Sequence, residues 1–406
     1  MDVRKKKILL CWGYNRKGWI APFEALKDKL DFVYLYYRFP GEEEACYTDC
    51  DRIYWYDYKS GFDILDDVKP DAVIFMSLTS GFPIALNAAC KTRNVLTYIF
   101  QHGLFRTYKE YRAIEEADRK ARKSNQVSSN DNSSNDEEIN GKSTLRFLLS
   151  SFTGKYYFSI LPVFIYFSVL KRRGLYYASY HLPLDVRKPS RYICYTPRNA
   201  TIYREMDKIG EDKIDYTGIP ELDVFFQDHS PVEEQDYFLL IDQPFAENRY
   251  YDFGVSKEQM NGFYEKLNTY CRSVNCRLKI KLHPESYKST WLFSDDNIDY
   301  IQDANMVPLI KNAKGVFGTT STLMLPAIFF KPCFLLLIHD SSFQKDMLEM
   351  GLANGADFFE FRPADIIFKK EVNSQHKHKF VYSYLFKTDG QSVERLRQIL
   401  ERTHEL

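Results

Sequence analysis

A histidine and a proline follow a strand pattern in the second half of the chain. Residues 279–285 read Lys-Ile-Lys-Leu-His-Pro-Glu, so apolar and charged residues alternate up to His283 and Pro284. A histidine at the carboxyl edge of a parallel strand lies where ligands bind, and a proline stops the strand and fixes the turn. We therefore predict a ligand-binding role for His283, with Pro284 and Glu285 beside it. A single His-Pro pair is also typical of loops without function, so the prediction depends on a second motif.

The second motif is a run of four hydroxyl residues. It lies between an apolar run at 315–318 and a helical pattern at 323–330. Its members are Thr319, Thr320, Ser321 and Thr322. Hydroxyls and free backbone N–H groups that gather at a helix N-terminus bind anions. Capping of the helix needs only one hydroxyl, so four in a row favour the binding of a phosphate group.

Both motifs fall within a chain of alternating strand and helix patterns. In the first half, apolar runs of strand length occupy 7–12, 32–36, 52–55, 72–76 and 95–100. A second series starts at 192–195 and continues at 237–241, 278–282, 315–318 and 333–337, with helical patterns at 257–271 and 323–330. Such alternation is typical of βαβ units on parallel sheets. The predicted fold class is α/β, with two Rossmann-like domains that face a cleft and bind ligands at the carboxyl ends of their strands.

Polar stretches of the chain indicate its domain boundaries. We predict a first domain over 1–226, a second over 227–390, and a closing amphipathic helix in 391–406, where apolar residues recur at helical spacing. The first domain carries an insert at 113–190. Within the insert, residues 124–140 contain one valine, one isoleucine and no other large apolar residue, so burial cannot offset the cost of ordering them. We predict that this segment is disordered.

The composition excludes several classes of protein. The 406 residues include 55 Lys and Arg and 55 Asp and Glu, so no net charge attracts nucleic acid, and we predict no nucleic-acid partner. The 45% of hydrophobic residues excludes global disorder. The eight cysteines have no recognised zinc spacing, and the short apolar run near the start does not resemble a secretory signal. We therefore expect free thiols in the cytoplasm, no metal and no cofactor.

The second part of the insert is basic, aromatic and apolar. Residues 141–191 hold nine lysines and arginines and one acid, and the uncharged runs in 145–173 are shorter than the roughly 20 residues that a spanning helix needs. This composition suits the surface of an anionic membrane. The residues expected to meet head groups are Lys155, Lys171, Arg172 and Arg173. A buried helix pair with a solvated basic rim explains the same pattern, and the sequence leaves both interpretations open.

Three short motifs in the second half, taken in order, resemble those of a known family. The segments 242–244, 281–285 and 318–322 are similar to the Gln-Pro, His-Pro and Ser/Thr motifs of bacterial sialyltransferases and polysialyltransferases. The resemblance spans roughly 192–359. It implies an inverting transferase of the GT-B fold that uses CMP-sialic acid without a metal. The same pattern is similar to capsule Kdo transferases and to CDP-glycerol glycerophosphotransferases of teichoic acid synthesis.

The resemblance also implies which residues bind the donor. The histidine of the His-Pro motif and the Ser/Thr pair bind the nucleotide phosphate in that family, which assigns this role to His283, Ser321 and Thr322. The complete predicted donor-binding set is Gln243, His283, Pro284, Glu285, Thr319, Thr320, Ser321 and Thr322. The segment 216–223 resembles the one that enters the second domain in these families. Its Gly218 and Pro220 allow a tight interdomain turn, so we predict a hinge there.

The first half departs from the family pattern at the catalytic base. Sialyltransferases of this kind carry an acidic pair followed by glycine after a strand of the first domain, whereas this chain reads Gln101-His102-Gly103. An imidazole can accept a hydroxyl proton near neutral pH as a carboxylate can. We therefore predict His102 as the general base, with Gln101 and Gly103 on the acceptor side; a histidine that only caps a loop is the alternative. The triplet also resembles Trp-His-Gly of the glycerophosphotransferases, which leaves the donor class open.

These motifs predict an inverting, metal-independent glycosyltransferase of bacterial surface polysaccharide synthesis, such as capsule or lipopolysaccharide. Its expected partners are a cytidine-activated sugar such as CMP-sialic acid or CMP-Kdo, a glycan or lipid-linked glycan acceptor, and an anionic membrane. The expected location is the cytoplasm, peripheral at the inner face of the cell membrane. Transfer of glycerol phosphate or another polyol phosphate from a CDP donor is the first alternative. A UDP-sugar 2-epimerase and a non-catalytic glycan-binding protein are alternatives of another class.

Overall fold

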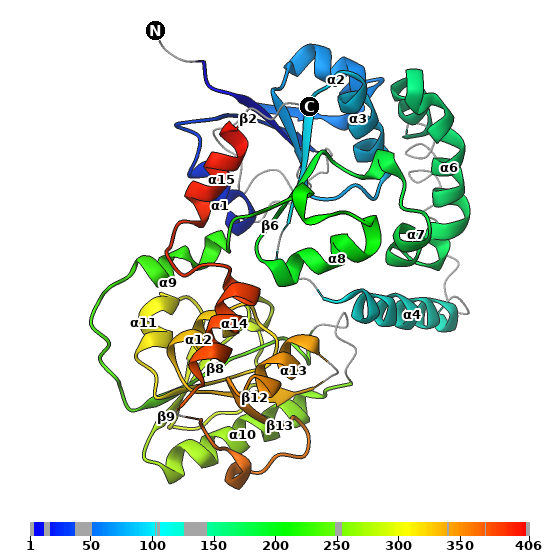
Figure 1. Ribbon diagram of the computed structural model, residues 1–406. Coiled ribbons are helices and arrows are strands. Elements are labelled where there is room, and N and C mark those ends of the chain that lie inside the picture. Colours follow the sequence, from blue (N-terminus) through cyan, green and yellow to red (C-terminus); the bar gives the residue numbers. More distant parts are fainter. Residues whose placement is uncertain are drawn as a thin grey trace. The chain divides into compact units, whose positions relative to one another are not determined.

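The chain folds into two compact units, each built on one parallel sheet (Figure 1). The structure is a computed structural model that describes residues 4–11, 17–36, 51–101, 103, 106–125, 144–247, 254–338, 341–369 and 371–402. Unit 1 comprises Met1–Glu221 and Gln391–Leu406, and unit 2 comprises Leu222–Gly390. Unit 2 is therefore inserted into unit 1 along the chain. The predicted α/β class with two parallel sheets is confirmed.

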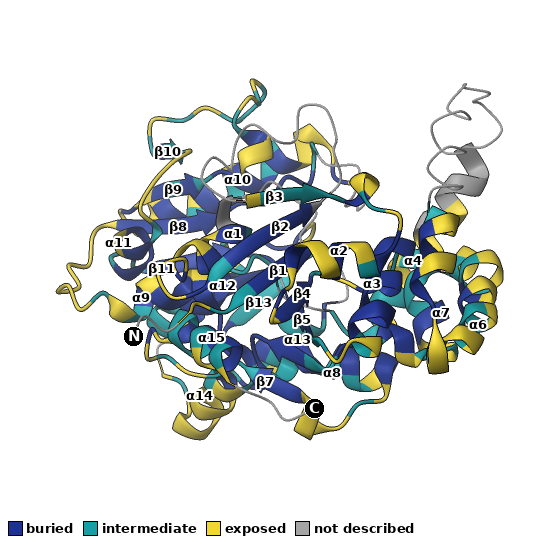
Figure 2. Cartoon of the chain, turned by 90° about the horizontal axis from the view of Figure 1, so that it is seen from above, coloured by how far each residue is buried: buried dark blue, intermediate teal, exposed yellow. Residues whose placement is uncertain are grey.

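Unit 1 contains a seven-stranded sheet in which every neighbouring pair is parallel. In sheet order the strands are β3 (Asp51–Tyr54), β2 (Asp31–Tyr36), β1 (Lys7–Cys11), β4 (Ala72–Phe75), β5 (Leu96–Phe100), β6 (Arg191–Cys194) and β7 (Ile214–Tyr216). The central strands are almost wholly buried, as Figure 2 shows, because helices cover the sheet. The strand order reverses between β1 and β4, and doubly wound sheets bind ligands at the carboxyl ends of the strands at such a point.

Outside its insert, unit 1 contains the helices α1 (Lys17–Glu24), α2 (Gly61–Val68), α3 (Gly81–Thr92), α8 (Pro197–Asp207) and α15 (Ser392–Glu401). Hydroxyl side chains cap the N-termini of two of them. The Ser60 hydroxyl accepts from the Asp63 N–H at 3.2 Å and caps α2, and Thr196 caps α8 in the same way. The predicted closing helix is α15, and its Arg395 Nε donates to the Thr217 carbonyl at 2.6 Å. The end of the described chain therefore completes unit 1.

The insert of unit 1 is mainly helical. Its elements are α4 (Tyr108–Asn125), a helix over 144–151, a 3-10 helix (Gly154–Ser159), α6 (Ile160–Ile165), a π turn (Tyr166–Leu170), a 3-10 turn (Lys171–Arg173) and α7 (Leu175–His181). Phe147, Phe152, Val163 and Tyr166 are buried in the core, whereas other residues of the same helices are exposed (Figure 2). Among the described residues, no helix is both long and apolar enough to cross a membrane. The predicted disordered segment, 124–140, lies outside the described residues except for the last two residues of α4.

Unit 2 repeats the same sheet order with six parallel strands. In sheet order they are β10 (Ile298–Ile301), β9 (Arg277–Lys281), β8 (Tyr237–Ile241), β11 (Gly315–Gly318), β12 (Cys333–Leu337) and β13 (Asn354–Asp357). The helices are α9 (Asp223–Gln227), α10 (Lys257–Ser273), α11 (Met306–Lys311), α12 (Met324–Phe330), α13 (Ser342–Glu349) and α14 (Ser374–Phe380). Here the order reverses between β8 and β11.

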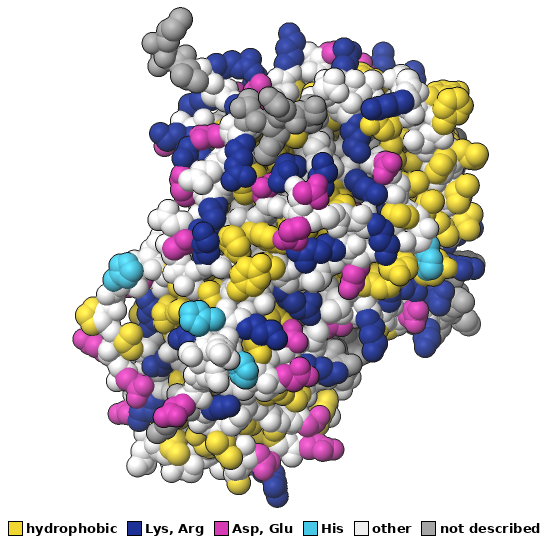
Figure 3. Space-filling model, viewed as in Figure 1, with side chains coloured by type: hydrophobic (Ala, Val, Ile, Leu, Met, Phe, Trp, Pro, Cys, Tyr) yellow, Lys and Arg dark blue, Asp and Glu magenta, His cyan; other side chains and the backbone are white. Residues whose placement is uncertain are grey.

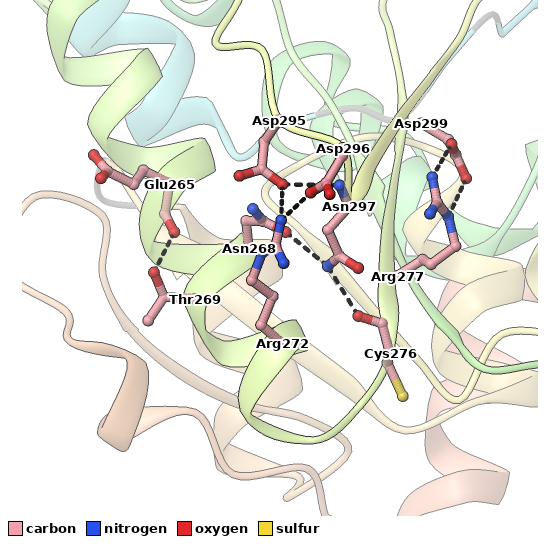
Figure 4. Close-up of polar contacts among 10 residues, drawn as sticks. All are labelled: Glu265, Asn268, Thr269, Arg272, Cys276, Arg277, Asp295, Asp296, Asn297 and Asp299. Atoms are coloured by element: carbon pink, nitrogen blue, oxygen red, sulfur yellow. Dashed lines mark hydrogen bonds and ion pairs between the residues drawn. The ribbon is translucent and has the colours of Figure 1, made fainter.

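Polar contacts fix β9 against its neighbours (Figure 4). Arg277 on β9 and Asp299 on β10 form a two-pronged ion pair with distances of 3.0 and 2.6 Å. The Asn297 amide donates to the Asn268 side chain at 2.8 Å and to the Cys276 carbonyl at 3.0 Å, which joins α10 to the start of both strands. These contacts set the register of β9, the strand that leads to the His-Pro motif.

Candidate active site

The carboxyl edge of the unit 2 sheet brings the sequence motifs together. Ile241 on β8 lies opposite Lys281 on β9 and Gly318 on β11. The residues that follow, Asp242 and Thr319 in particular, therefore leave the sheet side by side. This is also where the strand order reverses, so the motifs lie at the ligand-binding position of a doubly wound sheet.

His283 lies two residues beyond β9 and starts a 3-10 turn over Pro284–Ser286. Its Nδ1 accepts a hydrogen bond from the Glu285 N–H at 3.3 Å. In the neutral ring the proton then lies on Nε2, which can donate to an oxyanion. The ring is half-buried, while Pro284 and Glu285 are exposed. The turn thus orients the imidazole and fixes its tautomer.

The hydroxyl run forms the turn between β11 and α12. Thr319 is buried, and its Oγ1 has no hydrogen-bond partner among the described residues. Ser321 Oγ accepts from the Leu323 N–H at 3.3 Å, and Thr320, Ser321 and Thr322 are half-buried. One hydroxyl therefore caps the turn that precedes α12. The remaining three are placed at the same edge of the sheet as the His-Pro turn, on the other side of β8.

A buried carboxyl group stands at the centre of this edge. Asp242 is 4% exposed; its Oδ1 accepts from the Tyr264 hydroxyl at 3.0 Å, and its Oδ2 has no hydrogen-bond partner among the described residues. Burial raises the pKa of Asp242 to about 7, and the bond from Tyr264 offsets this only in part. Asp242 belongs to one of the three sequence motifs, but the motif alone assigns it no role. The signal in the sequence that could have identified Asp242 is an acidic residue directly after a run of five apolar residues.

Gln243 lies next to this carboxyl group and is half-buried. Its Nε2 donates to the Asp242 carbonyl at 3.0 Å, within the turn that follows β8. The predicted donor-binding residues of all three motifs therefore share one edge of one sheet. Their contacts with a nucleotide stay a prediction.

The residues predicted for the acceptor side lie after β5 in unit 1. Gln101 is buried, and its Nε2 donates to the Gly103 carbonyl at 3.1 Å. Gly103 has a φ of +76°, a conformation that favours glycine, and its carbonyl also accepts from Asn199 at 3.2 Å. The loop after β5 is thus held on both sides of position 102. His102 itself lies outside the described residues, and its role as general base stays a prediction.

The predicted hinge lies at the boundary between the units. Gly218 has a φ of +85°, and its N–H donates to the Tyr195 carbonyl at 2.9 Å. Pro220 begins a 3-10 turn that ends at Leu222, the first residue of unit 2. The glycine is required by the backbone conformation, and the proline fixes the turn.

Solved structures of low sequence identity share this fold. The glycotransferase of kitacinnamycin is 11% identical, with 98% of this chain and 95% of that chain covered and a TM-score of 0.50. The calicheamicin glycosyltransferase CalG4 is 13% identical, with coverage of 99% and 100% and a TM-score of 0.50. The UDP-GlcNAc 2-epimerase from Neisseria meningitidis is also 13% identical, with coverage of 97% and 99% and a TM-score of 0.50. The predicted GT-B-like fold is confirmed, and it is a fold that transferases share with an epimerase.

A family model identifies the class more closely. The model described as alpha-2,8-polysialyltransferase (POLYST) matches residues 59–333, which is more than half of the chain, and the chain belongs to this family. The protein is therefore a glycosyltransferase, and its family implies a nucleotide-sugar donor and a glycan acceptor. No curated protein matches the chain in a sequence comparison.

Proposed function

We propose that this protein transfers sialic acid from CMP-sialic acid to a glycan acceptor, with inversion and without a metal, in the synthesis of a bacterial surface polysaccharide. One observation carries the proposal: His283 and the hydroxyl run follow β9 and β11, the two neighbours of β8, at the same edge of the unit 2 sheet where its strand order reverses. The family match supports the choice of sugar. A fold shared with an epimerase does not separate these reactions, so the donor must be tested directly.

In the proposed reaction, the bond between the sugar carbon and the phosphate oxygen breaks and a bond to the acceptor oxygen forms. His283 Nε2–H and the hydroxyls of Ser321 and Thr322 donate to the phosphate of the departing CMP, so they stabilise the charge that develops there. His102 accepts the proton of the acceptor hydroxyl. Preorganised donors of this kind perform the role that a metal ion has in other transferases.

Nucleotide titration tests the donor class. CMP, CDP and UDP are titrated into the full-length protein while its melting temperature is followed, because a ligand that binds only the native state stabilises it. We expect CMP to raise the melting temperature most, and His283→Ala to weaken CMP binding at least tenfold. His378→Ala, which changes an exposed histidine on α14 of the same unit, is the matched control.

The other outcomes identify the alternatives. A preference for UDP would overturn the proposal in favour of epimerase-like chemistry. Turnover of CDP-glycerol without turnover of CMP-sialic acid would indicate polyol-phosphate transfer. Binding of glycan with no donor turnover at all would indicate a glycan-binding protein.

We further propose that the exposed face of the insert binds an anionic membrane surface. Phe158, just before α6, is 84% exposed, Leu161 within α6 is 68% exposed, and Val169 in the following π turn is 56% exposed. Figure 3 shows hydrophobic side chains gathered over α6 with lysines and arginines among them. Apolar side chains flanked by cations are typical of surfaces that enter the head-group region. The opposite face of the insert is buried, so the structure supports a helical insert packed on its unit, and the exposed face supports the membrane proposal.

The cations differ in what they can contact. Lys155, Arg172 and Arg173 are exposed, and Arg173 Nη1 also donates to the Tyr177 hydroxyl at 3.0 Å. Lys171 is half-buried and donates to the Thr79 carbonyl at 3.0 Å, and burial lowers its pKa. We therefore assign head-group contacts first to the three exposed cations.

Vesicle flotation tests the membrane proposal. Fully burying a side chain such as Phe or Leu is worth about 1.5–3 kcal/mol, so Phe158→Ser with Leu161→Ser should remove up to about 3–6 kcal/mol and lower membrane partitioning at least tenfold. Ile367→Ser in unit 2 removes an apolar side chain that is 63% exposed and is the control. Binding should also weaken with salt and on neutral lipid. Equal flotation of all variants would refute the proposal.

A further inference from the structure

The His-Pro turn and the hydroxyl run of unit 2 do not follow neighbouring strands. His283 follows β9 and the hydroxyl run follows β11, and β8 lies between these two strands. Neighbouring strands are about 4.8 Å apart, so β9 and β11 are separated by about 10 Å. A phosphate group that contacts both motifs therefore has to lie over the carboxyl end of β8. The residue that directly follows β8 is Asp242.

Asp242 is held by the strand and the helix beside it. Its N–H donates to the Lys281 carbonyl of β9 at 3.0 Å, and its Oδ1 accepts from the Tyr264 hydroxyl of α10 at 3.0 Å. The backbone N–H groups of Gln243 and His283 stabilise the charged form of the carboxyl group. The side chain is 4% exposed, so it lies beneath the surface on which a ligand rests. Asp242 can therefore act on a ligand through its charge and through the His-Pro turn, without contact.

Few charges surround this carboxyl group. The groups on the elements around it are Tyr264 of α10, Tyr300 of β10, Glu247 of the segment after β8, His283 of the turn after β9, and the uncharged Thr319 after β11. Both tyrosines stay neutral, because burial raises their pKa values, and the charge of Glu247 raises the pKa of Asp242 further. Lys281 directs its Nζ to the Leu282 carbonyl at 2.7 Å and to the Tyr287 hydroxyl at 3.0 Å.

The charge of Asp242 and the charge of a bound phosphate oppose each other. Burial raises the pKa of this carboxyl group to about 7, so near neutral pH the folded protein contains both the protonated and the ionised form. An ionised Asp242 beneath a phosphate places two negative charges at one sheet edge, where the low dielectric makes their repulsion strong. A proton on Asp242 removes this repulsion. Binding of the phosphate and binding of the proton therefore favour each other.

We propose that Asp242 is a positioning residue of the donor site and takes up a proton from solvent when the nucleotide phosphate binds. The proton is held on the carboxyl group, of which Oδ2 has no hydrogen-bond partner among the described residues. His283 and the hydroxyl run then meet the phosphate with no opposing charge beneath it. Because the two equilibria are linked, nucleotide affinity falls as pH rises above neutrality. The role of the phosphate rests on the proposed function, whereas the identity of the base and of the sugar does not enter.

Calorimetric titration of CMP into the full-length protein tests the proposal. Titration in several buffers with different enthalpies of ionisation counts the protons taken up per nucleotide bound. At pH 7.5 free CMP contributes little to this count, because a phosphate monoester loses its second proton near pH 6. If the bound phosphate makes ionisation of Asp242 tenfold less favourable, the wild type takes up about half a proton per CMP.

Three variants identify the group that takes up the proton. Asp242→Asn keeps the shape of the side chain and cannot ionise, so it should abolish the uptake. Asp303→Asn removes an exposed carboxylate of the same unit and should leave the uptake at about half a proton. His283→Gln removes the imidazole, and each CMP that this variant binds should still bring about half a proton.

A further variant keeps the test decisive if Asp242→Asn impairs folding. Tyr264→Phe removes the hydrogen bond that favours the ionised carboxyl group, so Asp242 of the free protein keeps its proton to higher pH. The pH at which CMP binding takes up most protons should therefore rise in this variant. An unchanged pH of maximal uptake would overturn the proposal. Binding of CMP to the wild type without uptake, or equal uptake by wild type and folded Asp242→Asn, would overturn it as well.

The same titrations with UDP separate this proposal from the proposed function. Proton uptake with UDP that is lost in Asp242→Asn, together with no binding of CMP, would support the role of Asp242 and overturn the cytidine-activated donor. Binding of CMP without proton uptake would overturn the role of Asp242 and leave the donor in place. Binding of neither nucleotide would overturn both.

Discussion

Replacing the buried aspartate of unit 2 should change how stability depends on pH. Asp242 lies behind the His-Pro turn with one oxygen bonded to Tyr264 and the other without a partner among the described residues. Asp242→Asn keeps the shape of the side chain and an acceptor for the Tyr264 hydroxyl, but it removes the ionisable group. Comparing the free energy of unfolding of the wild type with that of Asp242→Asn therefore measures the cost of ionising this buried carboxyl group.

The sign of the effect follows from where the proton is bound. Folded protein holds a proton on Asp242 up to about pH 7, whereas an aspartate in the unfolded chain releases it near the ordinary value of 3.8. Between these values the folded state binds more protons, so the free energy of unfolding falls as pH rises. The difference between the two pKa values corresponds to a loss of about 4 kcal/mol that is complete above pH 7. The loss is absent below about pH 4, where both states are protonated.

Urea unfolding of the full-length protein at a series of pH values measures this difference. We expect the wild type to lose stability relative to Asp242→Asn by up to about 4 kcal/mol as pH rises from about 4 to 8. Asp303→Asn removes an exposed carboxylate of the same unit and should follow the wild type. Parallel pH profiles for wild type and Asp242→Asn would show that water reaches the carboxyl group and that the reasoning from burial is wrong.

Three further changes have defined outcomes. His102→Ala should lower turnover while CMP affinity stays within about twofold, because a base engages the acceptor; a loss confined to CMP affinity would contradict its role. Ser321→Ala with Thr322→Val should weaken CMP binding at least tenfold. Loss of the cap should also lower the free energy of unfolding by about 1 kcal/mol. Unchanged CMP affinity would show that these hydroxyls only cap the turn. Gly61→Ala places a methyl group 2.9 Å from the Ala89 side chain between α2 and α3, so urea unfolding should show a loss of about 1–3 kcal/mol.

Buried strands could be predicted from the sequence, whereas most edge strands could not. The five residues of β8 are all apolar and all buried, so the run itself marks the strand. By contrast, β10 reads Ile-Asp-Tyr-Ile and β13 reads Asn-Gly-Ala-Asp, and most of their residues are only half-buried. Both lie at an edge of the sheet, where one side has no neighbouring strand and an apolar run is not required. Neither strand is therefore among those predicted from the sequence, and β7 at one edge of the other sheet is not among them either. The opposite edge of that sheet, β3, is the exception, because it matches the predicted run at 52–55.

The candidate site also has features that could be predicted from the sequence and features that could not. The position of His283 and the hydroxyl run at one edge of the same sheet could be predicted, because the carboxyl ends of parallel strands meet at one edge. The state of Asp242 could not, since it depends on Tyr264, which is 22 positions away on α10. A local sequence pattern predicts where a side chain leaves the backbone, but it does not predict which residues pack around that side chain.

Because unit 2 is inserted into unit 1, the ribosome synthesises residues 1–221 of unit 1 first, then the whole of unit 2, and residues 391–406 of unit 1 last. Unit 2 is one continuous stretch, and its two ends are joined by a hydrogen bond of 2.6 Å from the Gln227 amide to the Gly390 carbonyl, so it can close as soon as it emerges. Unit 1 has to wait for α15, whose Leu396, Ile399 and Leu400 are buried. During translation of residues 222–390, the nascent first unit therefore leaves the α15 site open. We therefore expect chaperones and proteases to reach the nascent chain most easily in that interval.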